Sequence, residues 1–208
     1  MTHPVPPADP AGPAGPTSPA DHAPSAPARS AGGQQPALPF ARITVRTGAL
    51  VFCGDEVALI RRDRPASALY TLPGGNVEDG EDFTAALHRE LAEELALDAG
   101  LAEGGGLMWV VDQRVTRPGP TAPPRKLHLV YRFHITPALR AGLAGHEADE
   151  LPDGTHDIGV IEWIDYREAA SLPLFPPVGA ALAALPEPRA AVPDAALPPV
   201  TDRNYSWI

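Results

Sequence analysis

Seven carboxylates crowd the segment from Gly75 to Leu97, where only His88 and Arg89 are candidate compensating cations. The carboxylates are Glu78, Asp79, Glu81, Asp82, Glu90, Glu93 and Glu94. Like charges at helical spacing repel one another by roughly a few tenths of a kcal/mol per pair. A bound dication would turn that repulsion into coordination, and hard oxygen ligands suit Mg²⁺ or Mn²⁺. Because a solvated face usually mixes charges of both signs, the segment predicts a metal site.

A predicted helix from Asp82 to Leu95 positions the last three of these carboxylates. Glu90, Glu93 and Glu94 stand at i, i+3 and i+4, so they share one helix face. An adjacent apolar stripe would dock the helix on a sheet, and it consists of Leu87, Leu91 and Leu95. The breaker Pro73-Gly74-Gly75 ahead of the helix brings a tight turn close to the carboxylates.

Strands dominate the rest of the chain. Alternating apolar and β-branched residues predict strands over 42–52, 56–62, 107–115, 126–135 and 158–164, with a turn at 54–55. Residues 137–157 read as a polar, acidic loop with a helical turn, and short helices are expected over 166–171 and 178–185. One long helix among locally connected strands indicates a mixed α/β fold rather than a regular βαβ series.

Composition divides the chain into three parts. Residues 1–38 are rich in Pro and Ala and poor in large apolar side chains, so we expect a disordered leader. A domain follows over 42–186, and 187–208 form a C-terminal extension. The extension ends in Tyr205, Trp207 and Ile208, which we expect to dock on the domain, on a second copy in a homodimer, or beside the substrate pocket.

Charge and cysteine content exclude several classes of protein. The formal net charge is −10 and no Lys/Arg run occurs, so no nucleic-acid polymer is expected as a partner. Cys53 is the only cysteine, which fits a reducing compartment. The chain shows neither a signal peptide nor an apolar run of membrane-spanning length, and we expect a cytoplasmic protein without membrane contact.

The acidic segment resembles the Nudix box, the signature of the Nudix hydrolases. The family pattern is Gly, five residues, Glu, seven residues, then Arg-Glu-apolar-any-Glu-Glu-any-Gly-apolar. This sequence meets every spacing from Gly75 to Leu97, and the preceding Leu-Pro-Gly-Gly is also typical of the family. Ala96 stands where the family has glycine, near a helix end that commonly takes a left-handed conformation, at a cost of about 1 kcal/mol. The resemblance spans roughly 42–186 and implies an α/β/α sandwich with a mixed sheet and one catalytic helix.

The resemblance also implies an activity and the residues that carry it. Nudix enzymes hydrolyse a nucleoside diphosphate linked to another group and use divalent metal, here Mg²⁺ or Mn²⁺. By correspondence, Glu90 and Glu94 are the principal metal ligands, and Glu93 is a further ligand or a catalytic contact to water. Arg89 orients these carboxylates. The turn is shaped by Gly74, Gly75 and Glu81.

Residues outside the box complete the expected site. The family often takes its general base from elsewhere, and the candidates in the acidic loop are Glu147, Asp149, Glu150, His156 and Asp157. Asp157 is our first choice, because it lies six residues before Trp163, in a place where members of the family often carry an acidic residue ahead of a strand with Trp. Arg61 and Arg62 end a strand and are expected either to contact substrate phosphate or to form surface ion pairs. We expect Trp109, Phe133 and Cys53 in the core, and structural roles for His128 and His134.

The sequence leaves the substrate open. An NTP, ADP-ribose, a nucleotide sugar and a dinucleoside polyphosphate all satisfy the resemblance. A different class of function, a non-catalytic Nudix-fold sensor that binds a nucleotide and regulates a partner, also remains. The intact set Arg89, Glu90, Glu93 and Glu94 favours the hydrolase, since a pure binder need not keep every metal ligand.

Overall fold

The computed structural model describes residues 42–65, 67–116, 123–150 and 153–205, within the unit of the chain that begins at Ala37. The predicted leader, Trp207 and Ile208 lie outside the described residues. In chain order the elements are β1 (Ile43–Cys53), β2 (Glu56–Arg64), β3 (Ser67–Thr71), α1 (Phe83–Leu95), η1 (Ala99–Leu101), β4 (Glu103–Arg114), β5 (Arg125–His134), α2 (Pro137–Arg140), β6 (His146–Glu150), β7 (His156–Asp165), η2 (Tyr166–Ser171), β8 (Leu174–Phe175), α3 (Gly179–Ala183) and β9 (Val200–Thr201).

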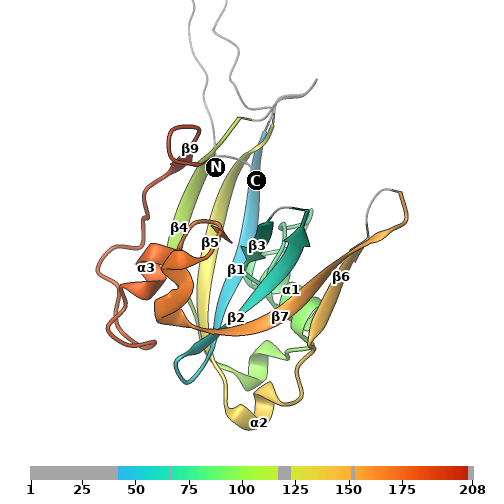
Figure 1. Ribbon diagram of the computed structural model, residues 1–208, viewed down its shortest axis with the longest axis vertical. Coiled ribbons are helices and arrows are strands. Elements are labelled where there is room, and N and C mark those ends of the chain that lie inside the picture. Colours follow the sequence, from blue (N-terminus) through green and yellow to red (C-terminus); the bar gives the residue numbers. More distant parts are fainter. Residues whose placement is uncertain (1–41, 66, 117–122, 151–152, 206–208) are drawn as a thin grey trace, which may run out of the picture. The chain divides into compact units, whose positions relative to one another are not determined.

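The strands form one mixed sheet, which confirms the predicted α/β class (Figure 1). Its order is β6-β7-β2-β1-β5-β4-β9, with β3 added to β2 and β8 added to β3. β1 runs parallel to β5, whereas β1–β2, β2–β7 and β4–β5 are antiparallel. The turn that joins β1 to β2 lies at Gly54-Asp55, as the sequence predicted.

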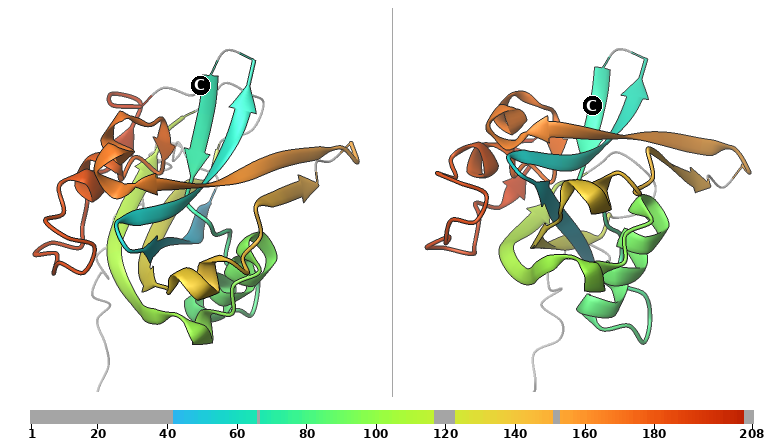
Figure 2. Two further views of the ribbon diagram at one scale, coloured as in Figure 1. Left: turned by 60° about the horizontal axis from the view of Figure 1, so that its bottom comes forward. Right: turned by 90° about the horizontal axis from the view of Figure 1, so that it is seen from below.

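Apolar side chains on the two sides of the sheet build two cores. One core contains the stripe Leu87, Leu91 and Leu95 of α1. The other contains residues of η2, α3 and β9. Figures 1 and 2 show α1 and α3 on opposite sides of the central strands, so the sheet is covered on both faces. The predicted core positions are confirmed, because Cys53, Trp109 and Phe133 are all buried.

Helix α1 begins and ends at residues that the sequence singled out. The Asp82 carboxylate accepts a hydrogen bond from the Ala85 amide at 2.8 Å and caps the first turn. At the other end Ala96 has φ 54° and ψ 31°, the left-handed conformation expected at the position where the family has glycine. The Leu97 amide donates to the Leu91 carbonyl at 3.0 Å, which closes the helix end.

The expected acidic loop over 137–157 is wrong in part, because it contains a strand. Residues 146–150 form β6, which pairs antiparallel with β7 in register from His146↔Val160 to Glu150↔His156. The sequence His-Glu-Ala-Asp-Glu has none of the β-branched alternation that signals a strand. Backbone pairing with β7 and ion pairs to β2 hold this segment extended.

The C-terminal extension contacts the domain where it is described. Val200 and Thr201 pair parallel with Gln113 and Arg114 of β4. The ring of Tyr205 lies 5.1 Å from that of Phe175, measured between centroids. The expected docking of Trp207 and Ile208 concerns residues outside the described part of the chain.

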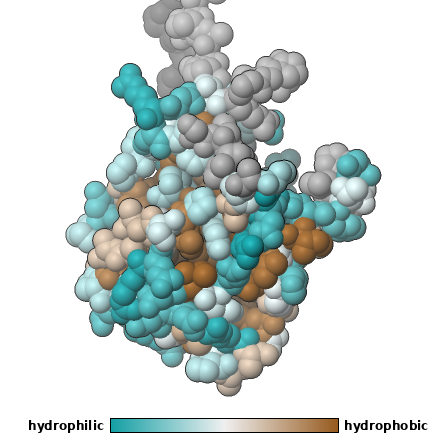
Figure 3. All heavy atoms as spheres, viewed as in Figure 1, coloured by the Kyte–Doolittle hydropathy of each residue, from teal (hydrophilic) through white to brown (hydrophobic). Residues whose placement is uncertain are grey.

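Among the described residues, five large apolar side chains are exposed. On the face shown in Figure 3, hydrophobic residues lie interspersed with hydrophilic ones. The exposed large apolar residues are Ile43, Phe83, Leu101, Leu107 and Ile158. Single exposed apolar residues are ordinary on protein surfaces. Within the described residues, no helix combines the length and apolar character needed to cross a membrane.

The left-handed Ala96 generates a stability prediction. Ala96→Gly should raise the free energy of unfolding by about 1 kcal/mol, because glycine adopts this conformation without steric cost. The matched control is Ala92→Gly, an exposed position inside the same helix, which should lower it by about 1 kcal/mol. Urea denaturation of the three proteins measures both changes. An Ala96→Gly protein less stable than the wild type would contradict the assigned cause.

Candidate active site

The site is built where β1 and β2 separate. The two strands pair only at Phe52↔Val57 and Cys53↔Glu56, and then diverge. Residues 73–77 occupy the edge of β1 that β2 leaves. Backbone hydrogen bonds join Ala49 to Pro73 at 2.8 Å, Thr47 to Gly75 at 2.9 Å and Val77 to Val45 at 3.0 Å. The turn that precedes the acidic helix is therefore fixed to the sheet like a short strand.

Glycine is required at positions 74 and 75 because other atoms lie too close to leave room for a side chain, and these atoms differ between the two positions. Gly74 has φ 137°, and a Cβ there would lie 2.2 Å from the Thr47 carbonyl oxygen. A Cβ on Gly75 would lie 1.8 Å from Oε1 of Glu90. The carboxylate of Glu90 thus occupies the space that a side chain at position 75 would fill. The turn and the helix meet at this point.

Glu94 is the buried carboxylate of the site. The residue is only 9% exposed, and its Oε2 accepts a hydrogen bond from the Gly74 amide at 2.6 Å. Burial raises its pKa to about 8, with smaller increases from the charges of Glu90 and Glu147. The Gly74 amide and the charge of Arg46 oppose this rise. A cation bound here would replace the proton that Glu94 otherwise holds at neutral pH.

Arg89 joins the segment that precedes α1 to the acidic face of the helix. Its guanidinium donates twice to Glu81, at 2.8 and 3.0 Å, and once to Oε1 of Glu90 at 2.9 Å. It also donates to Glu93 at 3.3 Å and to the Asn76 carbonyl oxygen at 3.2 Å. The hydrogen bonds from Arg89 lower the pKa of Glu81 to about 2. The side chain of Glu93 is 61% exposed and so faces the solvent side of this cluster.

The donor set around the turn fits a hard divalent cation. Glu90 and Glu94 come from α1, and Glu147 of β6 lies close enough to raise the pKa of Glu94. Oε1 of Glu147 is buried without a hydrogen bond, although it lies 2.5 Å from Nη2 of Arg62. Across the described ranges, no three His, Cys, Asp or Glu side chains already converge on one point. Glu90 pairs instead with Arg89, and Glu147 with Arg62, while the oxygen chemistry of the three carboxylates suits Mg²⁺ or Mn²⁺.

Arg61 and Arg62, the two arginines predicted to contact phosphate, lie in different surroundings. Arg62 is 7% exposed, lines a pocket, and contacts Glu147 and Asp149 at 2.5 and 2.6 Å. Arg61 is absent from that pocket's lining and pairs with Asp63 at 2.7 Å and with Glu162 at 2.8 Å. These contacts tie β2 to β6 and β7.

Asp157 lies in the same pocket and is held by arginine. Arg64 donates to both of its carboxylate oxygens, at 3.0 and 2.8 Å. Nε of Arg62 lies 3.5 Å from Oδ2. The hydrogen bonds from Arg64 lower the pKa of Asp157, which makes it a weak proton acceptor in this arrangement.

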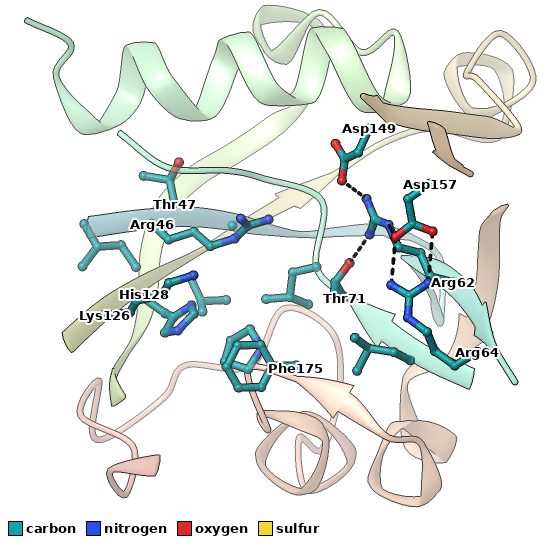
Figure 4. A pocket seen from close by; sticks show the side chains of 16 residues that line it. Arg46, Thr47, Arg62, Arg64, Thr71, Lys126, His128, Asp149, Asp157 and Phe175 are labelled. Atoms are coloured by element: carbon teal, nitrogen blue, oxygen red, sulfur yellow. Dashed lines mark hydrogen bonds and ion pairs between the residues drawn. The ribbon is translucent and has the colours of Figure 1, made fainter. Parts of the chain in front are cut away.

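Sequence reasoning missed the other side of this pocket. The cavity measures about 270 Å³ and is lined there by Arg46, Lys126, His128 and Phe175 (Figure 4). His128 forms a 2.8 Å hydrogen bond with Gln113, and burial lowers its pKa to about 3. Arg46, Lys126 and His128 do alternate along strands, but the parallel pairing of β1 with β5 that unites them has no local signal.

Comparison with known proteins gives the family of the chain. A family model described as the NUDIX domain matches residues 42–185. The chain therefore belongs to the Nudix family and is a Nudix hydrolase. The matched range agrees with the resemblance carried by Gly75 to Leu97. No match was found among curated proteins.

Solved structures that are similar to this chain come from several bacteria. The E. coli ORF135 protein is 23% identical, with a TM-score of 0.47, over 69% of this chain and 88% of that one. The MutT protein from Bacillus halodurans is 19% identical, with a TM-score of 0.47, over 67% and 79%. A bifunctional NMN adenylyltransferase/ADP ribose pyrophosphatase from Francisella tularensis, complexed with AMP and a Mn ion, is 23% identical, with a TM-score of 0.37, over 62% of this chain and 35% of that one.

The two glycines of the turn should respond differently to alanine. Gly75→Ala meets only the flexible end of Glu90, so stability should fall by less than about 1 kcal/mol while turnover falls about 10-fold or more. Gly74→Ala meets backbone and should cost about 3 kcal/mol of stability. Thermal denaturation and steady-state kinetics measure the two effects. Equal loss of stability in both variants would contradict the prediction that alanine at position 75 is tolerated because it meets only the flexible end of Glu90.

Proposed function

We propose that this Nudix hydrolase uses Mg²⁺ or Mn²⁺ to cleave the pyrophosphate bond of a nucleoside diphosphate linked to another group. The candidate substrates are an NTP, ADP-ribose, a nucleotide sugar and a dinucleoside polyphosphate. One observation carries the proposal: two carboxylates of α1 reach the Gly74-Gly75 turn, one filling the space beside Gly75 and the other bonded to the Gly74 amide.

Glu90 and Glu94 are the proposed principal metal ligands, with Glu147 as a third oxygen donor. Bound Mg²⁺ would neutralise the diphosphate and lower the pKa of a coordinated water. Arg89 acts as a positioning residue, because it holds Glu90 and Glu93 to the Glu81 loop through charge-assisted hydrogen bonds. The attack is on phosphorus, so a serine or cysteine nucleophile is not needed.

Glu93 is a better proposed proton acceptor than Asp157. Its carboxylate is 61% exposed and has one long contact, 3.3 Å from Nη1 of Arg89. Both oxygens of Asp157 already accept hydrogen bonds from Arg64, and its pKa is lowered. We therefore assign Asp157 to the ion pairs that shape the pocket, and Glu93 to the contact with water.

A non-catalytic nucleotide sensor is the second candidate function. It would need a nucleotide pocket, and the cavity lined by Arg46, Lys126 and Phe175 is the proposed one. It would not need the buried Glu94 carboxylate, whose raised pKa makes it costly to keep charged without a cation. This cost favours the hydrolase.

Glu94→Gln tests the proposal. The glutamine oxygen can still accept the Gly74 hydrogen bond, so the melting temperature should stay within a few degrees of the wild type or rise. Turnover with Mg²⁺ should fall by about 100-fold or more, because a metal ligand is lost. Mn²⁺ binding, followed by electron paramagnetic resonance, should weaken in parallel. The substrates are the four candidate classes, assayed by release of nucleoside monophosphate or phosphate.

Asp79→Asn is the matched control. It removes one negative charge from the same acidic segment at an exposed position. It should leave turnover and Mn²⁺ binding unchanged. Turnover like that of the wild type in Glu94→Gln at limiting Mg²⁺ would contradict the metal assignment. Binding of a nucleotide without turnover of any candidate by the wild type would identify the sensor instead.

A further inference from the structure

The hydroxyl of Thr47 is fully buried and makes no hydrogen bond with any described residue. Among those residues, Oγ1 of Thr47 and Oε1 of Glu147 are the buried side-chain oxygens without a hydrogen-bond partner. Glu147 has an ion pair with Arg62, at 2.5 Å, whereas a neutral hydroxyl can form none. A buried hydroxyl without a hydrogen bond costs stability, so its position calls for an explanation.

Thr47 lies directly opposite Gly75 where β1 pairs with residues 73–77. The antiparallel bridge Arg46↔Asn76 fixes the register of this pairing. The Thr47 amide donates to the Gly75 carbonyl oxygen at 2.9 Å. Residues directly opposite in an antiparallel pair point to the same face, with Cβ atoms about 5 Å apart. The side chain of Thr47 therefore projects beside the place where a Cβ on Gly75 would lie.

The carboxylate of Glu90 occupies that place. A Cβ on Gly75 would lie 1.8 Å from Oε1 of Glu90 and 2.5 Å from Oε2. Ala49, the next residue of β1 on the same face as Thr47, belongs to the core that contains Leu91 of α1. Figure 4 accordingly shows the Thr47 hydroxyl oxygen on the side of β1 that faces the helix. Thr47 and Glu90 are thus neighbours across the interface between β1 and α1.

The carboxylate of Glu90 is fixed at present by Arg89, which donates to Oε1 at 2.9 Å. A carboxylate that binds a cation is commonly held by hydrogen bonds from neighbouring groups, which set its orientation. Glu90 would have to turn towards a cation that it shares with Glu94. The Thr47 hydroxyl is a donor beside it that no other described group uses.

We propose that Thr47 is a positioning residue of the metal site, whose hydroxyl donates a hydrogen bond to the Glu90 carboxylate when Glu90 binds Mg²⁺ or Mn²⁺. The inference rests on the proposed function and adds to its site a residue from outside the acidic segment. The same hydrogen bond would satisfy the buried hydroxyl. Because the donor is neutral, it orients Glu90 without adding a positive charge that would repel the cation.

Thr47→Val tests the inference, because valine has nearly the shape of threonine and lacks the hydroxyl. The dissociation constant for Mn²⁺, followed by electron paramagnetic resonance, should rise about 10-fold, as expected when a group that orients a metal ligand is lost. Thr47→Ser should restore most of the affinity. The matched control is Thr44→Val, the same change on the opposite face of β1, which should leave Mn²⁺ affinity unchanged.

Melting temperatures separate positioning of Glu90 from a merely structural role. In EDTA, Thr47→Val should melt at or above the temperature of the wild type, because a buried hydroxyl without a partner is removed. The rise in melting temperature on addition of Mn²⁺ should be smaller in Thr47→Val than in the wild type. A melting temperature several degrees lower in EDTA, or Mn²⁺ affinity equal to that of the wild type, would overturn the inference.

Comparison with Glu94→Gln keeps this inference distinct from the proposed function. If Glu94→Gln weakens Mn²⁺ binding and Thr47→Val does not, the role of Thr47 is wrong and the metal site stands. If Mn²⁺ affinity depends on Thr47 but the wild type hydrolyses none of the four candidate classes, the hydrolase proposal is wrong and the role of Thr47 stands.

Discussion

The rest of the site depends on the edge of β1 beyond the point where β2 diverges from it. An unpaired edge leaves amides and carbonyls without partners, and residues 73–77 satisfy them. This pairing fixes the Gly74-Gly75 turn in the plane of the sheet. Because Glu90 fills the space beside Gly75 and Glu94 accepts from the Gly74 amide, the helix is placed by the same turn. Divergence of the same two strands also opens the pocket next to it.

Compensation of charge is the second theme of the structure. The acidic segment would repel itself, and Arg89 offsets part of that repulsion through its contacts to Glu81, Glu90 and Glu93. Glu94 is left buried with a raised pKa, which is costly for a charged carboxylate unless a cation is bound. The arginines of β2 have a different role, because they hold β6 and β7 through ion pairs with Glu147, Asp149 and Asp157. One set of contacts shapes the proposed cation site, and the other positions Glu147 beside it.

The pocket and the proposed metal site share a boundary at Arg46 and Gly74. Arg46 lines the pocket, donates to the Gly74 carbonyl oxygen, and its charge opposes the raised pKa of Glu94.

The sequence by itself determined the elements whose signals are local. The cap at Asp82, the apolar stripe of α1, the spacing of Glu90, Glu93 and Glu94, and the left-handed end at Ala96 were all predictable, because each depends on neighbours within a turn or two of helix. Only the tertiary structure decided that residues 146–150 form a strand, that Glu147 approaches Glu94, and that Arg46 and Lys126 share one half of a pocket. These features arise from pairing between strands far apart in the chain and from ion pairs that bury polar residues. Such contacts leave no periodicity in the sequence, so their partners become visible only once the register of the sheet is known.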